Sequence, residues 1–138
     1  MKKKLIFCFV IVFSLAVSCK KKTDVPSVAV DVYLNLQLSP YNHLQTPLNW
    51  IYFSAGSSGL IIYRKGGNDF TVLERTCTFD PSKSTARVQV LPDNFTCVDS
   101  TCGSRFSIND GAVINGPATQ PLIQYQYEFD GTTLHIYN

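Results

Sequence analysis

The sequence predicts an all-β fold, an antiparallel sandwich or open barrel of about ten short strands. One segment alternates between apolar and polar residues with a period of two, which is typical of a half-buried strand. Short apolar runs then recur, with turn residues about every eight to twelve positions. No segment after residue 18 shows the sustained 3.6-residue period of an amphipathic helix.

The alternating segment spans residues 28–38. Its apolar side chains share one face of the predicted strand: Val28, Val30, Val32, Leu34, Leu36 and Leu38. Because the opposite face is mostly polar, we expect this segment to cover the core with one face only. The next segment, Ser39 to Asn49, contains Pro40 and Pro47 and is expected to be a loop.

The remaining predicted strands are short and are separated by clusters of glycine, proline, asparagine and aspartate. We expect them at residues 50–53, 60–64, 70–75, 87–91, 95–98, 105–108, 112–114, 122–129 and 133–137. The turn sequence Asn109-Asp110-Gly111 is a strong hairpin signal. Tyrosine and phenylalanine on these strands are expected to pack in the core and on the sheets.

The first 18 residues have the pattern of an export signal. Three lysines precede a thirteen-residue apolar run from Leu5 to Val17, and a membrane-spanning helix needs about 20 residues. The sequence Leu15-Ala16-Val17-Ser18-Cys19 resembles a bacterial lipobox. This resemblance implies cleavage before Cys19 and lipidation of its thiol. The alternative is a plain signal peptide in which Cys19 has no such role.

Three regions follow from this interpretation: a signal peptide at 1–18, a lipidated cysteine with a flexible tether at 19–27, and one β domain at 28–138. We expect a protein of the cell envelope whose domain lies outside the cytoplasm and is held at a membrane by its N-terminal lipid. Without residues 1–18 the chain has nine Lys and Arg against ten Asp and Glu. It therefore lacks the clustered basic face of a nucleic-acid-binding protein. The sequence is compatible with a protein partner in the cell envelope.

Export also sets the redox environment of the cysteines, because disulfides persist outside the cytoplasm. The predicted domain contains Cys77, Cys97 and Cys102. Since three is an odd number, at most one bridge forms within the domain.

Several pieces of the domain stand in an order that resembles the Rieske iron–sulfur domain family. They are the strand Gly59 to Arg64, the Cys77 loop, a hairpin, Cys102-Gly103-Ser104, Asp110-Gly111, Gly116-Pro117-Ala118, Pro121-Leu122, Tyr125 and a closing hairpin. The resemblance covers residues 28–138 and implies a Rieske-like β fold. It also implies that Gly116 to Ala118 belongs to a proline loop that covers the site.

The cluster ligands of that family are only partly present. A Rieske centre needs Cys-x-His in its first loop and Cys-x-x-His in its second. The resemblance places Cys77 and Phe79 at the first pair of positions, and Asp99 and Cys102 at the second. The two histidines of the chain, at positions 43 and 135, lie outside both loops. Because a phenyl ring cannot donate to iron, an ordinary [2Fe–2S] centre is not expected.

The first interpretation of these loops is a disulfide between Cys77 and Cys102. It would close a loop of about 25 residues and contribute on the order of 3 kcal/mol in the chain-entropy model. Cys97 would then be a small buried residue on its strand. A bridge between Cys77 and Cys97 remains an alternative.

The second interpretation is a zinc site. The sequences Cys77-x-x-Asp80 and Asp99-x-x-Cys102 together supply two thiolates and two carboxylates. The simpler explanation, which we favour, is that Asp80 forms a turn before Pro81 and that Asp99 caps its own loop.

Catalysis by this chain is the interpretation that the sequence favours least. A reactive thiol needs a base or a positive field beside it, and no histidine is near these cysteines in sequence. We therefore expect a non-catalytic accessory or binding role and no cofactor. The alternative is an electron carrier outside the cytoplasm that binds a [2Fe–2S] cluster or another metal at the two cysteine loops.

Overall fold

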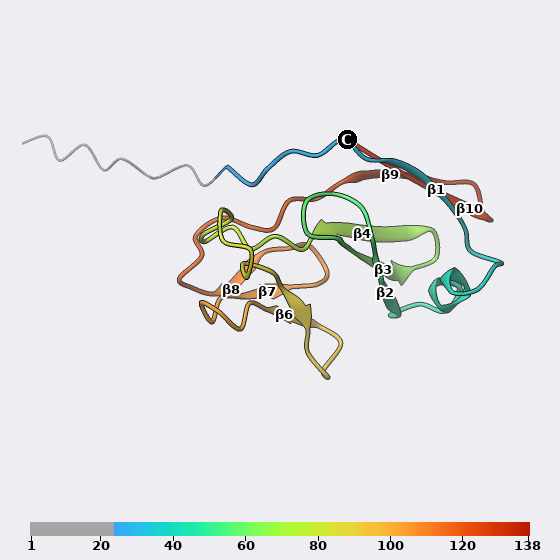
Figure 1. The fold of residues 1–138 in the computed structure, drawn as a ribbon. Coiled ribbons are helices and arrows are strands. Elements are labelled where there is room, and N and C mark those ends of the chain that lie inside the picture. Colours follow the sequence, from blue (N-terminus) through green and yellow to red (C-terminus); the bar gives the residue numbers. More distant parts are fainter. Residues whose placement is uncertain (1–23) are drawn as a thin grey trace, which may run out of the picture.

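The computed structural model describes residues 24–138, so the predicted signal peptide and the lipobox with Cys19 lie outside the described residues. The elements are β1 (Asp31–Asn35), η1 (Tyr41–Gln45), β2 (Trp50–Phe53), β3 (Leu60–Gly66), β4 (Asp69–Glu74), β5 (Gln89–Val90), β6 (Thr96–Val98), β7 (Arg105–Ser107), β8 (Val113–Asn115), β9 (Gln126–Phe129) and β10 (Thr133–Tyr137). They form three antiparallel sheets, β1–β10–β9, β2–β3–β4 and β5–β6–β7–β8 (Figure 1). The prediction of an all-β fold with about ten short strands is confirmed, and the three sheets do not join into one closed barrel.

Hydrophobic clusters lie on both faces of the sheet β2–β3–β4. Strand β3 shows this directly, because its Leu60 and Ile62 belong to one cluster, called the first cluster here, while its Ile61 and Tyr63 belong to the second cluster on the opposite face. All four side chains are at most 3 % exposed. A strand that is covered on both faces needs a continuous apolar run instead of alternation. Sheet β1–β10–β9 packs against the first cluster, and sheet β5–β6–β7–β8 with its loops packs against the second (Figure 1).

The alternating segment at 28–38 has the predicted inward face, but its strand is shorter than predicted. Val30, Leu34 and Leu36 are buried, whereas Val28 and Leu38 at the two ends are 40 % and 60 % exposed. The strand β1 has five residues because β10 pairs with five, from Tyr137 opposite Asp31 to Thr133 opposite Asn35. Alternation therefore marked the face correctly and overestimated the length.

The segment from Ser39 to Asn49 is not only a loop. A five-residue 3-10 helix, η1, lies between the two prolines, and its Leu44 is completely buried in the first cluster. Pro40 occupies the position just before this helix and Pro47 follows it. Because both prolines are outside the helix, neither removes one of its hydrogen bonds.

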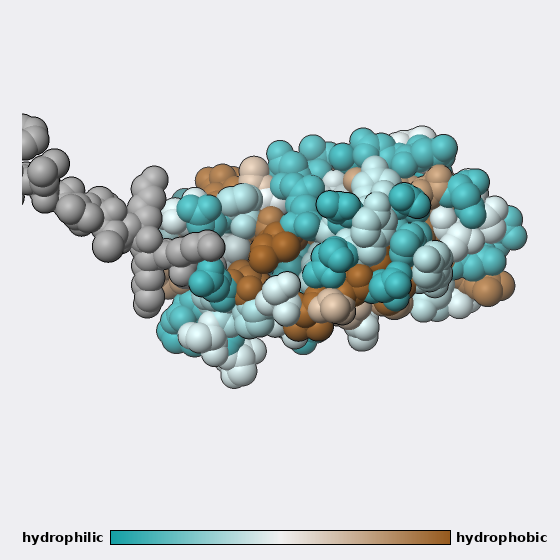
Figure 2. Space-filling view, turned by 90° about the horizontal axis from the view of Figure 1, so that it is seen from above, coloured by the Kyte–Doolittle hydropathy of each residue, from teal (hydrophilic) through white to brown (hydrophobic). Residues whose placement is uncertain are grey.

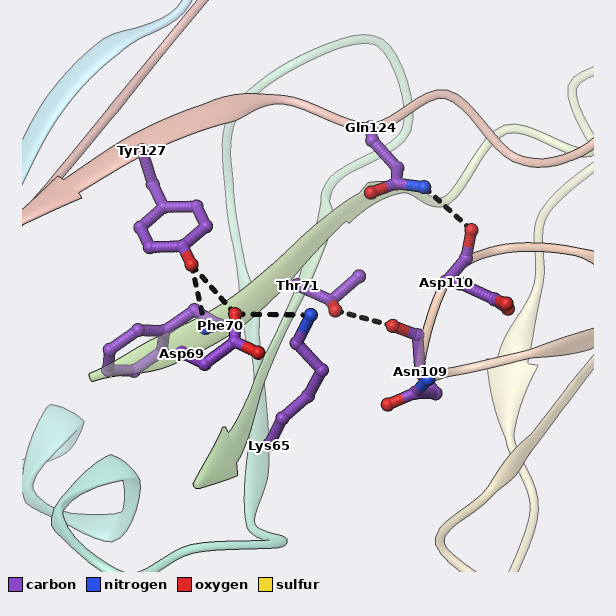
Figure 3. Close-up of polar contacts among 8 residues, drawn as sticks. All are labelled: Lys65, Asp69, Phe70, Thr71, Asn109, Asp110, Gln124 and Tyr127. Carbon is purple, nitrogen blue, oxygen red and sulfur yellow. Dashed lines mark hydrogen bonds and ion pairs between the residues drawn. The ribbon is translucent and has the colours of Figure 1, made fainter. Parts of the chain in front are cut away.

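Side-chain contacts join the middle sheet to both neighbouring sheets (Figure 3). The hydroxyl of Tyr127 on β9 donates to Asp69 Oδ1 at 2.9 Å and accepts the N–H of Phe70 at 3.1 Å. On the other side, Thr71 Oγ1 donates to the carbonyl of Asn109 in the β7–β8 turn at 2.6 Å. These contacts fix strand β4, which leads directly into the first cysteine loop.

The Tyr127→Phe variant is expected to be less stable by about 1 kcal/mol at neutral pH, and by less in acid. The hydrogen bond from Tyr127 holds the pKa of Asp69 below its usual range. A lowered pKa means that the ionised carboxylate stabilises the fold above its unfolded pKa of about 4, and that this contribution is lost as the pH falls through the folded pKa. Urea unfolding of both proteins at neutral pH and near pH 3 measures the difference. If the wild type and the variant differ in free energy of unfolding by the same amount at both pH values, this linkage is contradicted.

The outer face of sheet β1–β10–β9 is polar and aromatic. Tyr33 is 68 % exposed, and its ring stacks on His135 with the ring centroids 4.0 Å apart. His135 Nε2 lies 2.7 Å from Asp31 Oδ1. Hydrophilic residues predominate over this part of the surface in the view from above (Figure 2). Tyr33 therefore packs on the outer face of the sheet, in agreement with the expectation that aromatic residues on the strands pack in the core and on the sheets.

None of the described residues belongs to a helix that is long and apolar enough to cross a membrane.

Candidate functional site

The first cysteine loop connects β4 to β5. It begins with an isolated bridge between Thr76 and Arg87, and the N–H of Cys77 donates to the carbonyl of Ala86 at 3.0 Å. These backbone contacts hold Cys77 at the base of the loop, where its side chain is completely buried. Phe79, two residues later, is 43 % exposed.

The second cysteine loop connects β6 to β7 and is closed by its own hydrogen bonds. The N–H of Asp99 donates to the carbonyl of Ser104 at 3.0 Å, and the N–H of Gly103 donates to the carbonyl of Asp99 at 2.7 Å. Asp99 Oδ1 accepts the N–H of Thr101 at 2.8 Å, an Asx turn of the kind that aspartate favours. Asp99 is 1 % exposed, whereas Cys102 is partly exposed.

The two loops bring Cys77, Asp99 and Cys102 together. The two sulfur atoms lie 3.8 Å apart, and Cys102 Sγ lies 3.3 Å from Asp99 Oδ2. One ligand atom from each of the three residues lies within 4.8 Å of the other two. Thr101 Oγ1 of the second loop also donates to the carbonyl of Thr85 in the first loop at 3.2 Å. The site is therefore built from both loops, and a hydrogen bond between residues other than these three also joins the loops.

A third segment, residues 116–121, packs against both loops. The N–H of Ala118 donates to Ser104 Oγ at 2.9 Å, and Thr78 Oγ1 donates to the carbonyl of Gln120 at 2.6 Å. This is the segment that resembles a proline loop, and the structure places it beside the site. Ser104 is completely buried, with its Oγ 3.1 Å from Cys102 Sγ.

The structure adds roles that sequence reasoning did not assign. Ser104 links the second loop to the third segment, and Thr78 does the same for the first loop. The sequence did indicate that Ser104 belongs to the site, because this residue is part of the Cys-Gly-Ser piece of the family resemblance. It gave no such indication for Thr78, since the partner of Thr78, Gln120, is 42 positions away.

The electrostatic environment keeps the buried thiols protonated. Burial raises the pKa of Cys77 well above its usual value, and the Asp99 carboxylate acts in the same direction. The N–H of Phe79 opposes this shift. Burial also raises the pKa of Cys97 to about 12. A thiol in such surroundings becomes a thiolate only when another positive charge takes the place of its proton.

We expect iodoacetamide to modify Cys102 first in the reduced, metal-free protein. Cys77 and Cys97 are completely buried and have raised pKa values, so their alkylation should be slower by roughly tenfold or more. Peptide mass spectrometry after timed labelling measures the three rates. In denaturant all three cysteines should react alike, and native labelling of Cys77 as fast as that of Cys102 would contradict the assignment.

The other predicted site residues lie apart from this group. Asp80 Oδ2 pairs with Lys83 Nζ at 2.9 Å and Asp80 Oδ1 accepts from Ser82, so Asp80 is not among the three clustered ligands. Cys97 lies on β6 in the second hydrophobic cluster, as a small buried residue. Among the described residues all three cysteines are free thiols, so the disulfide remains a prediction.

Comparisons with known proteins give a structural likeness and no sequence match. No protein-family model matches the chain, and a comparison with curated proteins gives no match. The fold is similar to that of the plasma-membrane Rieske protein PetC3 from the cyanobacterium Synechocystis PCC 6803, with a TM-score of 0.54, 17 % identity, and coverage of 80 % of this chain and 98 % of that one. The ferredoxin of carbazole 1,9a-dioxygenase from Nocardioides aromaticivorans IC177 gives a TM-score of 0.48, 20 % identity, and coverage of 80 % and 97 %.

The domain has a Rieske-like fold. The family resemblance of the cysteine loops and the proline loop is therefore confirmed at the level of the fold. Likeness at this identity says nothing about what the site binds, which depends on its own donor atoms.

The donor atoms of this Rieske-like domain do not fit a [2Fe–2S] Rieske centre, which needs two thiolates and two imidazoles. Phe79 cannot bind a metal, and Asp99 supplies a carboxylate at a position where the family has a thiolate. His135 lies on β10 and is paired with Asp31, while His43 lies in η1. Neither histidine belongs to the group of candidate metal ligands in the described part of the chain.

Proposed function

We propose that this chain is a lipid-anchored protein of the cell envelope. Its Rieske-like domain would work without a [2Fe–2S] cluster, as a non-catalytic accessory or binding domain. The observation that carries this proposal is the donor set of the two loops, in which the side chains of Phe79 and Asp99 replace an imidazole and a thiolate.

The state of the thiols supports a non-catalytic role. A nucleophilic cysteine needs a lowered pKa and a base or a positive charge beside it. Cys77 has the opposite environment, because it is buried beside the carboxylate of Asp99 and its pKa is raised. The hydrogen-bond partners of Cys102 include Asp99 and Ser104, and neither is a base that activates a thiol. Lys83 is the cation whose charge interacts with Cys102, and its Nζ is paired with Asp80 Oδ2 at 2.9 Å.

The proposed anchor depends on the order of residues at the N-terminus. A charged start, an apolar run that ends at Val17, and Ser18-Cys19 together resemble a lipoprotein signal. The lipid chains would supply membrane affinity of about 0.8 kcal/mol for each buried CH₂ group.

An electron carrier is the second candidate function. The observation that favours it is the convergence of three ligand atoms at the place where a Rieske-like fold brings its two loops together. It requires that the chain hold a redox-active group with ligands other than those of a Rieske centre.

The test is the composition and colour of the full chain extracted from membranes in detergent without oxygen. We expect a colourless protein without stoichiometric iron or inorganic sulfide. A brown preparation with iron and sulfide in equal amounts would overturn the proposal in favour of the electron carrier. In the same cells the Cys19→Ser variant should leave the membrane fraction, and full retention of this variant would overturn the lipid anchor.

A further inference from the structure

Two distances in the group formed by Cys77, Asp99 and Cys102 are close to those of a zinc site, and its three ligand atoms all lie within 4.8 Å of one another. Two sulfur atoms bound to one tetrahedral Zn²⁺ at about 2.3 Å are about 3.8 Å apart, and a sulfur and a carboxylate oxygen are about 3.6 Å apart. The observed Sγ–Sγ distance is 3.8 Å and the observed distance from Cys102 Sγ to Asp99 Oδ2 is 3.3 Å. A disulfide needs sulfur atoms about 2.0 Å apart, so the side chains would have to move to form one.

The buried carboxylate also distinguishes a metal from a disulfide. Asp99 is 1 % exposed, and its Oδ1 is occupied by the N–H of Thr101. The polar neighbour of Oδ2 is the thiol of Cys102. Oxidation of the two cysteines would remove the thiol protons and leave a buried carboxylate oxygen without a donor, which is unfavourable. A cation bound by the same three side chains satisfies that oxygen.

The donor set suits the same occupant. Two thiolate sulfurs and one carboxylate oxygen are ligands that Zn²⁺ takes in proteins, and their convergence here comes from both loops. Binding of one Zn²⁺ would release the thiol protons to the solvent.

Hydrogen bonds outside the group hold Cys102 and Asp99 in place before any metal binds. Ser104 Oγ contacts Cys102 Sγ and accepts the N–H of Ala118. Contacts of this outer kind orient ligands and raise metal affinity. Cys102 is partly exposed, so the group can be reached from the solvent through this side chain.

We propose that Cys77, Asp99 and Cys102 bind one Zn²⁺ ion through their two sulfur atoms and one carboxylate oxygen. This inference rests on the proposed function, because the same loops cannot hold an iron–sulfur cluster at the same time. It also replaces the sequence-based preference for Asp99 as only a loop cap, and it leaves Asp80 out of the ligand set.

The experiment is a Co²⁺ titration of the full chain in detergent, without oxygen and with a phosphine reductant, followed by displacement with Zn²⁺. We expect about one equivalent of Co²⁺ with the absorption of a tetrahedral thiolate complex, which Zn²⁺ abolishes. The Cys102→Ser and Asp99→Asn variants should weaken binding by roughly tenfold or more. Asparagine keeps the Oδ1 acceptor of the Thr101 turn, so Asp99→Asn removes the charge and not the loop geometry.

Cys97→Ala is the matched control, because it removes a buried cysteine that is not in the group. This variant should bind Co²⁺ as the wild type does. Binding without thiolate absorption, equal weakening by Cys97→Ala and Cys102→Ser, or a Cys77–Cys102 disulfide that persists under the reductant would each overturn the zinc site. If no metal and no sulfide are found, only this inference fails, whereas iron with sulfide would refute the proposed function as well.

Discussion

The Gly56→Ala variant is expected to lose roughly 3 to 5 kcal/mol of its free energy of unfolding. Gly56 has a φ of +69°, which an L-residue with a side chain rarely adopts. A Cβ atom at this position would also collide with Glu74 Oε2 and would lie 2.8 Å from the hydroxyl oxygen of Tyr125. Neither partner can swing into solvent, because Glu74 is 1 % and Tyr125 is 7 % exposed.

The collision is costly because Glu74 is a buried carboxylate with every hydrogen-bond partner in place. Oε2 accepts from the N–H of Ser57 at 2.8 Å and from the hydroxyl of Tyr125 at 3.0 Å. Oε1 accepts from the N–H of Ser58 at 2.9 Å and from the N–H of Thr76 at 3.1 Å. A carboxylate that moves away from the new methyl group leaves several of these donors unpaired in the core. The same network fixes the start of the Cys77 loop through Thr76.

Gly67→Ala is the matched control for this prediction. Gly67 also has a positive φ, +53°, but no atom lies within 4 Å of the position of its Cβ. Its replacement should therefore lower the free energy of unfolding by about 1 kcal/mol, because only the positive φ, and no collision, opposes a side chain there. Urea unfolding of the two variants beside the wild type separates the two contributions. If both variants lose a similar free energy of unfolding, the hydrogen bonds of Glu74 rearrange around the new methyl group at little cost, and the prediction is wrong.

The buried faces of the strands could be predicted from sequence because the core selects them residue by residue. The alternation at 28–38 identified the inward residues Val30, Leu34 and Leu36. Strand ends were less predictable, because they depend on how many residues the partner strand offers, as β10 does for β1. The Glu74 network was outside the reach of sequence reasoning, since Tyr125 donates to it from 51 positions away.

The candidate site could be predicted in part. The family resemblance brought the Cys77 loop, the Asp99–Cys102 loop and the proline loop to one place, and the structure has them together. The spacing Cys77-x-x-Asp80 and Asp99-x-x-Cys102 looks symmetric and gave no reason to separate the two carboxylates. The fold separates them, because the Asx turn directs Asp99 inward while Asp80 pairs with Lys83.

Zinc is expected to stabilise the reduced protein against unfolding. A ligand that binds only the folded state adds about 2.7 kcal/mol when its free concentration is 100 times its dissociation constant. For this chain the gain should arise at the two cysteine loops, since the metal would tie Cys77 to Cys102 across a separation of 25 residues. Urea unfolding with Zn²⁺ and with a chelator measures the gain directly.

The variants decide whether this stabilisation comes from the proposed group. The zinc-dependent gain should persist in Cys97→Ala and should largely disappear in Asp99→Asn, although both proteins differ from the wild type in their metal-free stability. Comparing each variant with itself, with and without zinc, removes that difference from the result. Binding to exposed carboxylates would raise the stability of all the variants alike, and such a result would assign the gain to the surface and not to the loops. A gain that depends on Asp99 instead requires a cation between the loops, because no other role of that carboxylate is linked to zinc.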